Sequence, residues 1–129
     1  MTESSKGGSR SGLLGAWGES LAGEYLRRRH YELVAANFRC RSGEVDIIAR
    51  KGRYLAFVEV KLRRNADFAE AREFVTASKQ ARVILAAQVW LTKHPSKLQP
   101  RFDVIKIYAP EGLETKTPKI NHIKDAFEL

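Results

Sequence analysis

The chain has 129 residues, 43% of them hydrophobic and 29% charged, which suits one globular domain and is too short for two ordinary ones. It has no apolar run of the roughly 20 residues that a membrane-spanning helix needs, and its single cysteine excludes an intrachain disulfide and a zinc site of several thiolates. A formal net charge of +8 favours nucleic acid, an anionic membrane surface or acidic proteins as partners.

The first predicted element is a helix that follows a short tail. Residues 1–12 are mostly small or polar and lack the apolar centre of a secretory signal, so we expect a flexible tail, a single domain over residues 13–129 and a cytoplasmic location. Over residues 13–29, apolar side chains recur at three- and four-residue steps, which predicts a helix.

Strand patterns come next along the chain. Residues 31–38 predict a short first strand, and stronger patterns follow over residues 44–50 and 54–62. The sequence Lys-Gly-Arg at residues 51–53 is typical of a tight turn, so these two strands are predicted to form a hairpin.

The second half of the chain predicts one more helix and further strands. Residues 65–75 are ambiguous, residues 78–93 predict a helix that ends before Pro95, and residues 101–109 predict a strand. A weaker strand signal lies at residues 120–123. This order of elements predicts an α/β domain with a mixed β-sheet flanked by α-helices.

The predicted hairpin places acidic side chains opposite one another. If its turn is centred on residues 52 and 53, Asp46 lies opposite Glu59 and Glu44 lies opposite Lys61, with Cβ atoms roughly 4.5 to 5.5 Å apart. Two carboxylates so close repel each other, and a divalent cation such as Mg²⁺ would compensate. Lys61 shares a face with Glu59, where it would orient or deprotonate a water or stabilise charge on a phosphate.

The same residues also have a purely structural interpretation. Glu59 and Lys61 would then belong to a solvated strand face, with Glu44 and Lys61 as an ordinary cross-strand ion pair. The apolar setting, F-V-E-V opposite D-I-I, favours the functional interpretation because unpaired carboxylates are costly there.

A third acid lies in the first predicted helix. Glu19 has small neighbours at helical spacing, which would let the helix approach the sheet: Gly15, Ala16, Ala22 and Gly23. Glu19 is either a metal ligand or water-positioning group, or a plain solvated side chain. Glu24 has larger, basic neighbours and is predicted to form surface ion pairs.

Five motifs in order resemble those of one protein family. They are G-A-W-G-E-S-L-A (15–22), N-F-R-C-R-S-G-E-V-D-I-I-A (37–49), F-V-E-V-K (57–61), K-Q (79–80) and R-F-D-V (101–104). Together they resemble the YraN-like family of small bacterial proteins, which is placed in the PD-(D/E)xK nuclease superfamily. The archaeal Holliday-junction resolvases are similar in architecture.

The resemblance implies a restriction-endonuclease-like core and phosphodiester cleavage that depends on Mg²⁺ or Mn²⁺. The positions that match the superfamily's metal-binding and catalytic residues are Glu19, Asp46, Glu59 and Lys61. Lys79 and Gln80 match a motif that supports the site or contacts the nucleic-acid backbone in related nucleases, and their alternative is a pair of solvated residues in the first turn of a helix.

Three positions depart from the family pattern. Val45 replaces the proline of the superfamily name, Leu62 replaces a small polar residue, and Ala69 replaces a glycine. None of them is a proposed ligand, but the last two leave open how residues 63–75 meet a substrate.

Other polar residues carry weaker signals. The histidines lack metal-ligand spacing and are predicted at the surface or at helix ends: His30, His94 and His122. Cys40 has no histidine near it in sequence, so we expect no nucleophilic role. Asp103 is predicted to be structural and paired with Arg101 or another cation. Phosphate contacts, or a solvated face, are the alternatives for the arginines beside the central strands: Arg39, Arg41, Arg63 and Arg64.

The resulting hypothesis is a metal-dependent endonuclease that acts on DNA, with branched DNA among its expected substrates. Asp46 and Glu59 would hold Mg²⁺ or Mn²⁺ with help from Glu19, and Lys61 would position or activate water. The alternatives are a nucleic-acid-binding module that keeps the fold but cleaves nothing, and a basic adaptor for another protein. A homodimer is a further expectation, because enzymes that resolve two-fold junctions need two sites.

Overall fold

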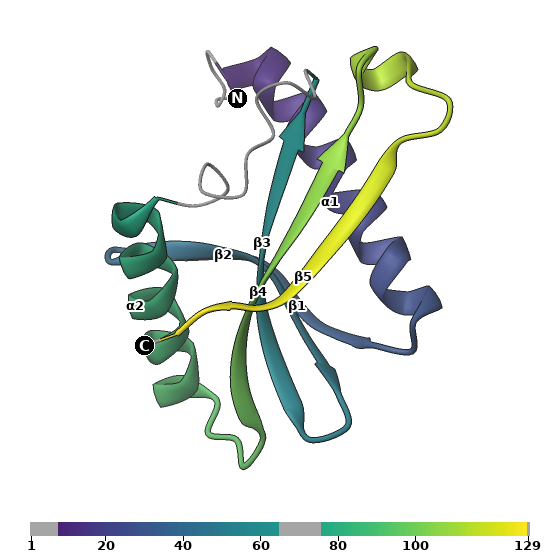
Figure 1. Ribbon diagram of the computed structural model, residues 1–129. Coiled ribbons are helices and arrows are strands. Elements are labelled where there is room, and N and C mark those ends of the chain that lie inside the picture. Colours follow the sequence, from purple (N-terminus) through teal and green to yellow (C-terminus); the bar gives the residue numbers. More distant parts are fainter. Residues whose placement is uncertain (1–7, 65–75, 129) are drawn as a thin grey trace.

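A single five-stranded β-sheet carries one α-helix on each face (Figure 1). The structure is a computed structural model that describes residues 8–64 and 76–128. Its elements in chain order are α1 (Gly8–Arg28), β1 (Glu32–Cys40), β2 (Gly43–Lys51), β3 (Tyr54–Arg63), α2 (Ala77–Lys93), β4 (Gln99–Tyr108), the 3-10 turn η4 (Gly112–Glu114) and β5 (Lys119–Phe127). Within the described ranges, neither helix is long and apolar enough to cross a membrane.

The strands lie in sequence order, from β1 at one edge to β5 at the other. Neighbouring strands are antiparallel except for β3 and β4, which are parallel. Parallel neighbours need a long connection, and α2 lies in that connection. The predicted α/β domain with a mixed sheet flanked by helices is therefore confirmed.

Two apolar cores, one on each face of the sheet, hold the helices in place. On one face α2 contributes Val83, Ala86 and Ala87, which pack with Phe57 and Phe102. The α1-side core combines helix and strand residues of the opposite face, including Ala22, Leu26, Val58, Ile105 and Ile107. Since successive strand residues point to opposite faces, β3 and β4 are buried on both sides, as their continuous apolar sequences require.

Two elements are longer than predicted from sequence by four residues or more. Helix α1 begins at Gly8, so residues 8–12 of the predicted tail are helical, while residues 1–7 lie outside the described residues. Adding a turn to an existing helix costs less than starting one, which allows a weak helical sequence to join it. Strand β5 runs over nine residues instead of four. Its half-exposed sequence gives only a weak strand signal, and pairing with β4 supplies the hydrogen bonds that extend it.

A buried ionic network joins β4 to β5. The Asp103 carboxylate is fully buried and accepts hydrogen bonds from Arg101 Nε and Nη2, at 2.9 and 2.8 Å, and from the Asp125 backbone N–H at 3.0 Å. The His122 ring, with a side chain 2% exposed, lies 2.8 Å from the same carboxylate through Nε2. The structural role predicted for Asp103 is confirmed, but the surface position predicted for His122 is wrong, because the ring fills the space beside Tyr25 and Tyr31.

The hydrogen bonds of this network keep Asp103 ionised. Burial alone would raise the pKa of the Asp103 carboxyl, but hydrogen bonds from His122, Arg101 and the Asp125 backbone outweigh it and lower the pKa below its ordinary value. The negative charge is thereby shared among several donors and can stay buried.

Asp103→Ala is expected to lower the free energy of unfolding by about 3 to 5 kcal/mol, because it leaves the Arg101 guanidinium buried without its carboxylate. Glu128→Ala, at an exposed position beyond β5, is the control and should change stability by less than about 0.5 kcal/mol. Urea denaturation of both variants measures the difference. Equal stability of the two variants would contradict the structural role of Asp103.

Candidate active site

The candidate site lies where strands β2 and β3 separate. Their ladder pairs Lys51 with Tyr54 at the turn and continues to Ile47 and Val58. This is the predicted hairpin register. One residue further, a side chain replaces the backbone as hydrogen-bond acceptor. Asp46 Oδ2 accepts a 2.8 Å hydrogen bond from the backbone N–H of Val60. The carboxylate is thus held rigidly at the end of the ladder.

Side-chain alternation along β2 breaks at Asp46. Val45 and Ile48 both belong to the α2-side core, whereas Ile47 belongs to the α1-side core, so strict alternation fails between residues 45 and 47. Across the β1–β2 ladder the residue opposite Asp46 is Asn37, which has a φ of 54°. Asparagine tolerates this left-handed conformation better than most residues. The irregularity explains how Asp46 interacts with Glu19 of α1 and lies near enough to Lys79 of α2 to feel its charge.

Helix α1 brings Glu19 to this point of the sheet. The Glu19 carboxyl interacts with the side chains of Asn37 and Asp46. The close approach is tightest at Gly18, where a Cβ atom would lie 3.2 Å from Leu62 Cδ1, whereas a Cβ at Gly23 would make an ordinary contact of 3.4 Å with Leu33 Cδ1. Gly18 is not among the small neighbours predicted for Glu19, although its position directly before Glu19 in the sequence G-E-S was a usable signal.

The other small residues near Glu19 do less than expected. Ala22 is fully buried, as predicted, but Gly15 and Ala16 are exposed and a Cβ at Gly15 would meet nothing within 4 Å. Glu24 is exposed as well. The Leu62 side chain, a departure from the family pattern, occupies the space beside Gly18, and Ala69 lies outside the described residues.

Glu59 is the most buried acid of the site, with 3% of its surface exposed. Its Oε2 lies 3.4 Å from Lys79 Nζ, whereas the buried Oε1 has no hydrogen-bond partner among the described residues. Burial and the nearby charge of Asp46 raise the pKa of Glu59 to about 7, against the opposing attraction of Lys79 and Lys61. A buried carboxylate oxygen without a partner is costly, so this oxygen needs a proton or a ligand to satisfy it.

Burial raises the pKa of all three acids of the site, and the charge of Asp46 adds to the shift of Glu19 and Glu59. Burial and the neighbouring Asp46 charge raise the pKa of Glu19. The pKa of Asp46 is raised mainly by burial, although the Val60 N–H and the positive charges of Lys79 and Lys61 oppose the change. Clustered acids with raised pKa values are typical of functional sites, because folding alone gains nothing from holding them together.

Lys79 enters the site from the first turn of α2. Thr76 caps this helix by accepting the Lys79 backbone N–H at its Oγ1, 3.1 Å away, and the Lys79 ammonium lies 3.4 Å from both Glu59 and Glu44. Burial disfavours the ammonium ion, but attraction to Glu59, Glu44 and Asp46 outweighs this and raises the pKa of Lys79. Lys79 therefore contacts two of the acids, with a side chain that is 22% exposed, and its support of the site stays a prediction.

Glu44 does not follow the predicted pairing with Lys61. Its carboxylate contacts Lys79 and, at 3.7 Å, Arg39 instead. The β2–β3 ladder already ends at Ile47 and Val58, so residue 44 is no longer held opposite residue 61. Lys61 is half-buried and lies near enough to Asp46 and Glu59 to lower the pKa of both carboxyls.

The other residues predicted to support the site or bind the nucleic-acid backbone differ in how exposed their side chains are. Arg39 has a side chain 75% exposed and its charge lowers the pKa of Glu19, while Arg41 is exposed in the β1–β2 turn. Arg63 is half-buried at the end of β3, where its Nη1 donates to the Leu62 carbonyl at 3.3 Å. Gln80 is half-buried in the first turn of α2.

The carboxylates of the site are the groups that could hold a divalent cation. Within residues 8–64 and 76–128, no group of three or more His, Cys, Asp or Glu side chains is arranged to hold a metal ion. The site offers the pair Asp46 and Glu59, with the unpartnered Glu59 Oε1, and Glu19 beside Asp46. Mg²⁺ is commonly bound through one or two carboxylates with waters and substrate phosphates, so the pair fits such an ion.

The chain is similar to known proteins over most of its length. Residues 18–107 match "Uncharacterised protein family UPF0102". The chain is 46% identical over 125 residues to a UPF0102 protein of Geobacter sulfurreducens, an alignment that covers 96% of this chain and 95% of the relative. It is 48% identical over 117 residues to one of Geotalea uraniireducens, with 90% of each chain covered. A third, from Caldanaerobacter subterraneus subsp. tengcongensis, is 40% identical over 116 residues, with 88% and 93% covered.

Gly43→Ala is expected to destabilise the domain by about 1 to 3 kcal/mol, because the added Cβ would overlap the carbonyl group of Arg82 and push α2 away from β2. Gly15→Ala, in open space on α1, is the matched control and should be neutral or stabilising by up to about 1 kcal/mol. Free energies of unfolding from urea titrations test this contrast, and equal values would contradict the close contact at Gly43.

The raised pKa of Glu59 gives a defined pH dependence of stability in EDTA. The folded state holds this proton more tightly than the unfolded chain, where the pKa is near 4.5, so the contribution is complete below pH 4.5 and is lost as the pH rises through about 7. Glu59→Gln cannot ionise. Its free energy of unfolding relative to wild type should therefore rise by on the order of 2 kcal/mol between pH 5 and 8.

Denaturation titrations at a series of pH values measure this difference. Glu24→Gln, at an exposed position of α1, serves as the control and should follow the wild-type pH profile. A Glu59→Gln difference that stays constant with pH would show that the Glu59 carboxyl titrates normally.

Proposed function

This chain belongs to the uncharacterised protein family UPF0102, and we propose that it is a metal-dependent endonuclease that hydrolyses DNA phosphodiesters. The observation that carries the proposal is the buried Glu59 carboxylate, which has one oxygen near Lys79 and the other without a partner, beside a second carboxylate from Asp46. The order V-D followed by E-V-K supports a place in the PD-(D/E)xK nuclease superfamily.

Asp46 and Glu59 would hold Mg²⁺ or Mn²⁺, with Glu19 next to Asp46 as a further ligand or water-positioning group. When bound, such an ion supplies positive charge to the phosphate and lowers the pKa of a bound water. The Val60 N–H already orients the Asp46 carboxylate. This ligand would therefore lose little side-chain freedom when a cation binds.

Lys61 and Lys79 have different roles in the proposed reaction. Lys61 shares the face of Glu59 on β3 and would orient the attacking water or stabilise negative charge on the phosphate. Lys79 acts as a positioning residue. Its ammonium lowers the pKa of Glu59 and thus favours the ionised carboxylate that a cation requires.

Contacts with the DNA backbone would come from the arginines around the site. Arg39 and Arg41 lie exposed on and beside β1, and Arg63 lies at the end of β3. Their planar guanidinium groups suit phosphate oxygens. Cleavage at a two-fold branched junction needs two such sites, so for that substrate the proposal includes a homodimer.

Cleavage of end-labelled linear, flapped and four-way-junction DNA in Mg²⁺, Mn²⁺ or EDTA tests the proposed function. Metal-dependent cutting should fall about 100-fold or more in Asp46→Asn and in Lys61→Ala. Asp46→Asn retains a side-chain oxygen that can accept the Val60 N–H, so the site should keep its shape. Lys119→Ala, exposed on β5, removes a lysine elsewhere and should cut at the wild-type rate.

Two results would contradict the proposal. Cutting that persists at the same rate in both site variants would place the activity outside this site. Binding of every substrate without cutting, by wild-type protein in either metal, would favour a nucleic-acid-binding module that keeps the fold.

A further inference from the structure

Away from the carboxylate site, the structure has a second concentration of charge. Arg28 ends helix α1 and Arg29 follows it in a turn. Lys51 and Arg53 flank Gly52 in the β2–β3 turn, and Arg101 and Lys124 come from β4 and β5. We call these six residues the basic face. They line three hollows of about 760, 430 and 470 Å³, and successive hollows share residues, so the surface is continuous.

Aromatic rings contact four of these cations, of which Arg101 is also paired with an acid. Arg29 lies 4.4 Å from the centre of the Tyr25 ring, and Lys51 lies 5.3 Å from that of Tyr31. Arg53 and Arg101 lie 5.2 and 4.8 Å from the centre of the Tyr54 ring. A ring orients a cation without cancelling its formal charge, so positive charge is positioned here and stays available.

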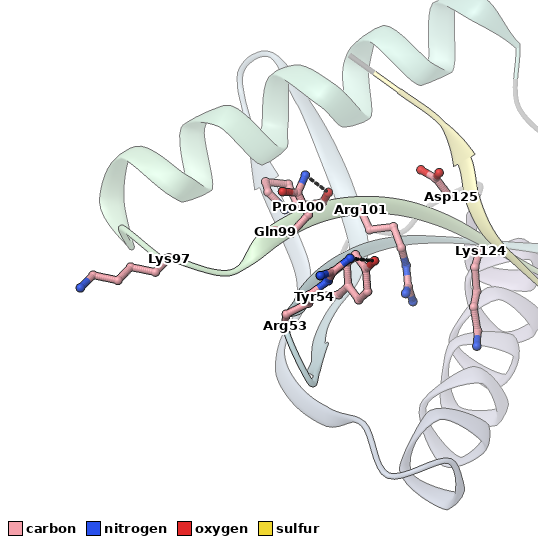
Figure 2. A pocket seen from close by; sticks show the side chains of 8 residues that line it. All are labelled: Arg53, Tyr54, Lys97, Gln99, Pro100, Arg101, Lys124 and Asp125. Carbon is pink, nitrogen blue, oxygen red and sulfur yellow. Dashed lines mark hydrogen bonds between the residues drawn. The ribbon is translucent and has the colours of Figure 1, made fainter.

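The basic face has little negative charge to balance it. Arg101 is paired with the buried Asp103, but in the described part of the chain the other five cations have no carboxylate partner. Asp125 is the single acid among the described residues that line the three hollows. In Figure 2 its carboxylate points away from the side chains of Arg101 and Lys124, which extend in a common direction.

The basic face is separate from the candidate active site. Tyr54 and Glu59 are five residues apart on β3, about 16 Å at the usual rise per residue, and an odd separation puts their side chains on opposite faces of the sheet. A phosphate bound beside Lys61 therefore does not reach Lys51 or Arg53, which lie next to Tyr54 at the β2–β3 turn. The two surfaces would contact different parts of a ligand.

We propose that the basic face is a second, non-catalytic binding surface for the phosphate backbone of nucleic acid. Its extent across three hollows fits a chain of phosphates better than one small anion, and its cations present no base-reading pattern. With the carboxylate site occupied, the basic face holds another segment of a bent or branched molecule. The inference shares with the proposed function only the nucleic-acid ligand, and binding in EDTA separates it from cleavage.

The test measures binding of a labelled 30-base-pair duplex in EDTA over a range of salt concentrations. The triple variant Lys51→Gln, Arg53→Gln and Lys124→Gln should weaken binding at least about tenfold and reduce the slope of log affinity against log salt by about 2.7, since each phosphate contact contributes about 0.9. The control triple variant has the same charge and changes three exposed lysines elsewhere: Lys93→Gln, Lys116→Gln and Lys119→Gln.

Equal weakening by the two triple variants would overturn the proposal, because net charge alone would explain it. Unchanged binding by the first triple variant would overturn it too. Loss of binding to phosphatidylserine vesicles with unchanged DNA binding would assign the surface to anionic membranes instead.

A second measurement does not depend on the folding of a triple variant. Acetylation of wild-type lysines, followed by mass spectrometry, should show Lys51 and Lys124 protected at least about threefold by the duplex, while Lys116 and Lys119 react as before. The single variant Lys124→Glu, at an exposed position, should weaken DNA binding on its own. Equal protection of all four lysines would contradict a distinct binding surface.

Discussion

The arrangement of the site depends on one hydrogen bond that replaces a rung of the sheet. Where the β2–β3 ladder ends, the Asp46 carboxylate takes the backbone N–H of Val60 at 2.8 Å. This bond lets the strands separate without leaving a buried N–H unpaired. It also fixes a negative charge between α1 and α2, and the charge of Asp46 helps to raise the pKa of both Glu19 and Glu59.

Two apolar cores supply the stability that such a concentration of charge requires. Burying three carboxylates together opposes folding, and the helices packed on each face hold the strands that carry them. Lys79 is the main compensating group, and it reaches Glu44 and Glu59 because Gly43 lets α2 approach β2. A rigid scaffold with an incompletely neutralised acid cluster is what the proposed binding of a cation requires.

Much of the fold and part of the site could be predicted from sequence, because the signals are local. Alternation and the Gly52 turn predicted the hairpin and its register up to Ile47 and Val58. The register failed beyond that point, where Glu44 contacts Lys79 instead of Lys61, since the bend at Asn37 and Asp46 has no local signature. The burial of His122 was missed for the same reason, because its partner Asp103 lies on another strand.

By itself, the sequence determined the order of helices and strands, the basic charge, and which acids and lysine share the central hairpin. These properties follow from side-chain periodicity and residue type, which act over a few neighbouring residues. Only the tertiary structure decided that Glu19 and Lys79 lie beside the hairpin acids and that Glu59 is buried with one oxygen unpartnered. It also decided that the cations of the basic face, several of them packed on aromatic rings, lie together. Helix packing and strand order bring these distant residues together, and they depend on the whole chain.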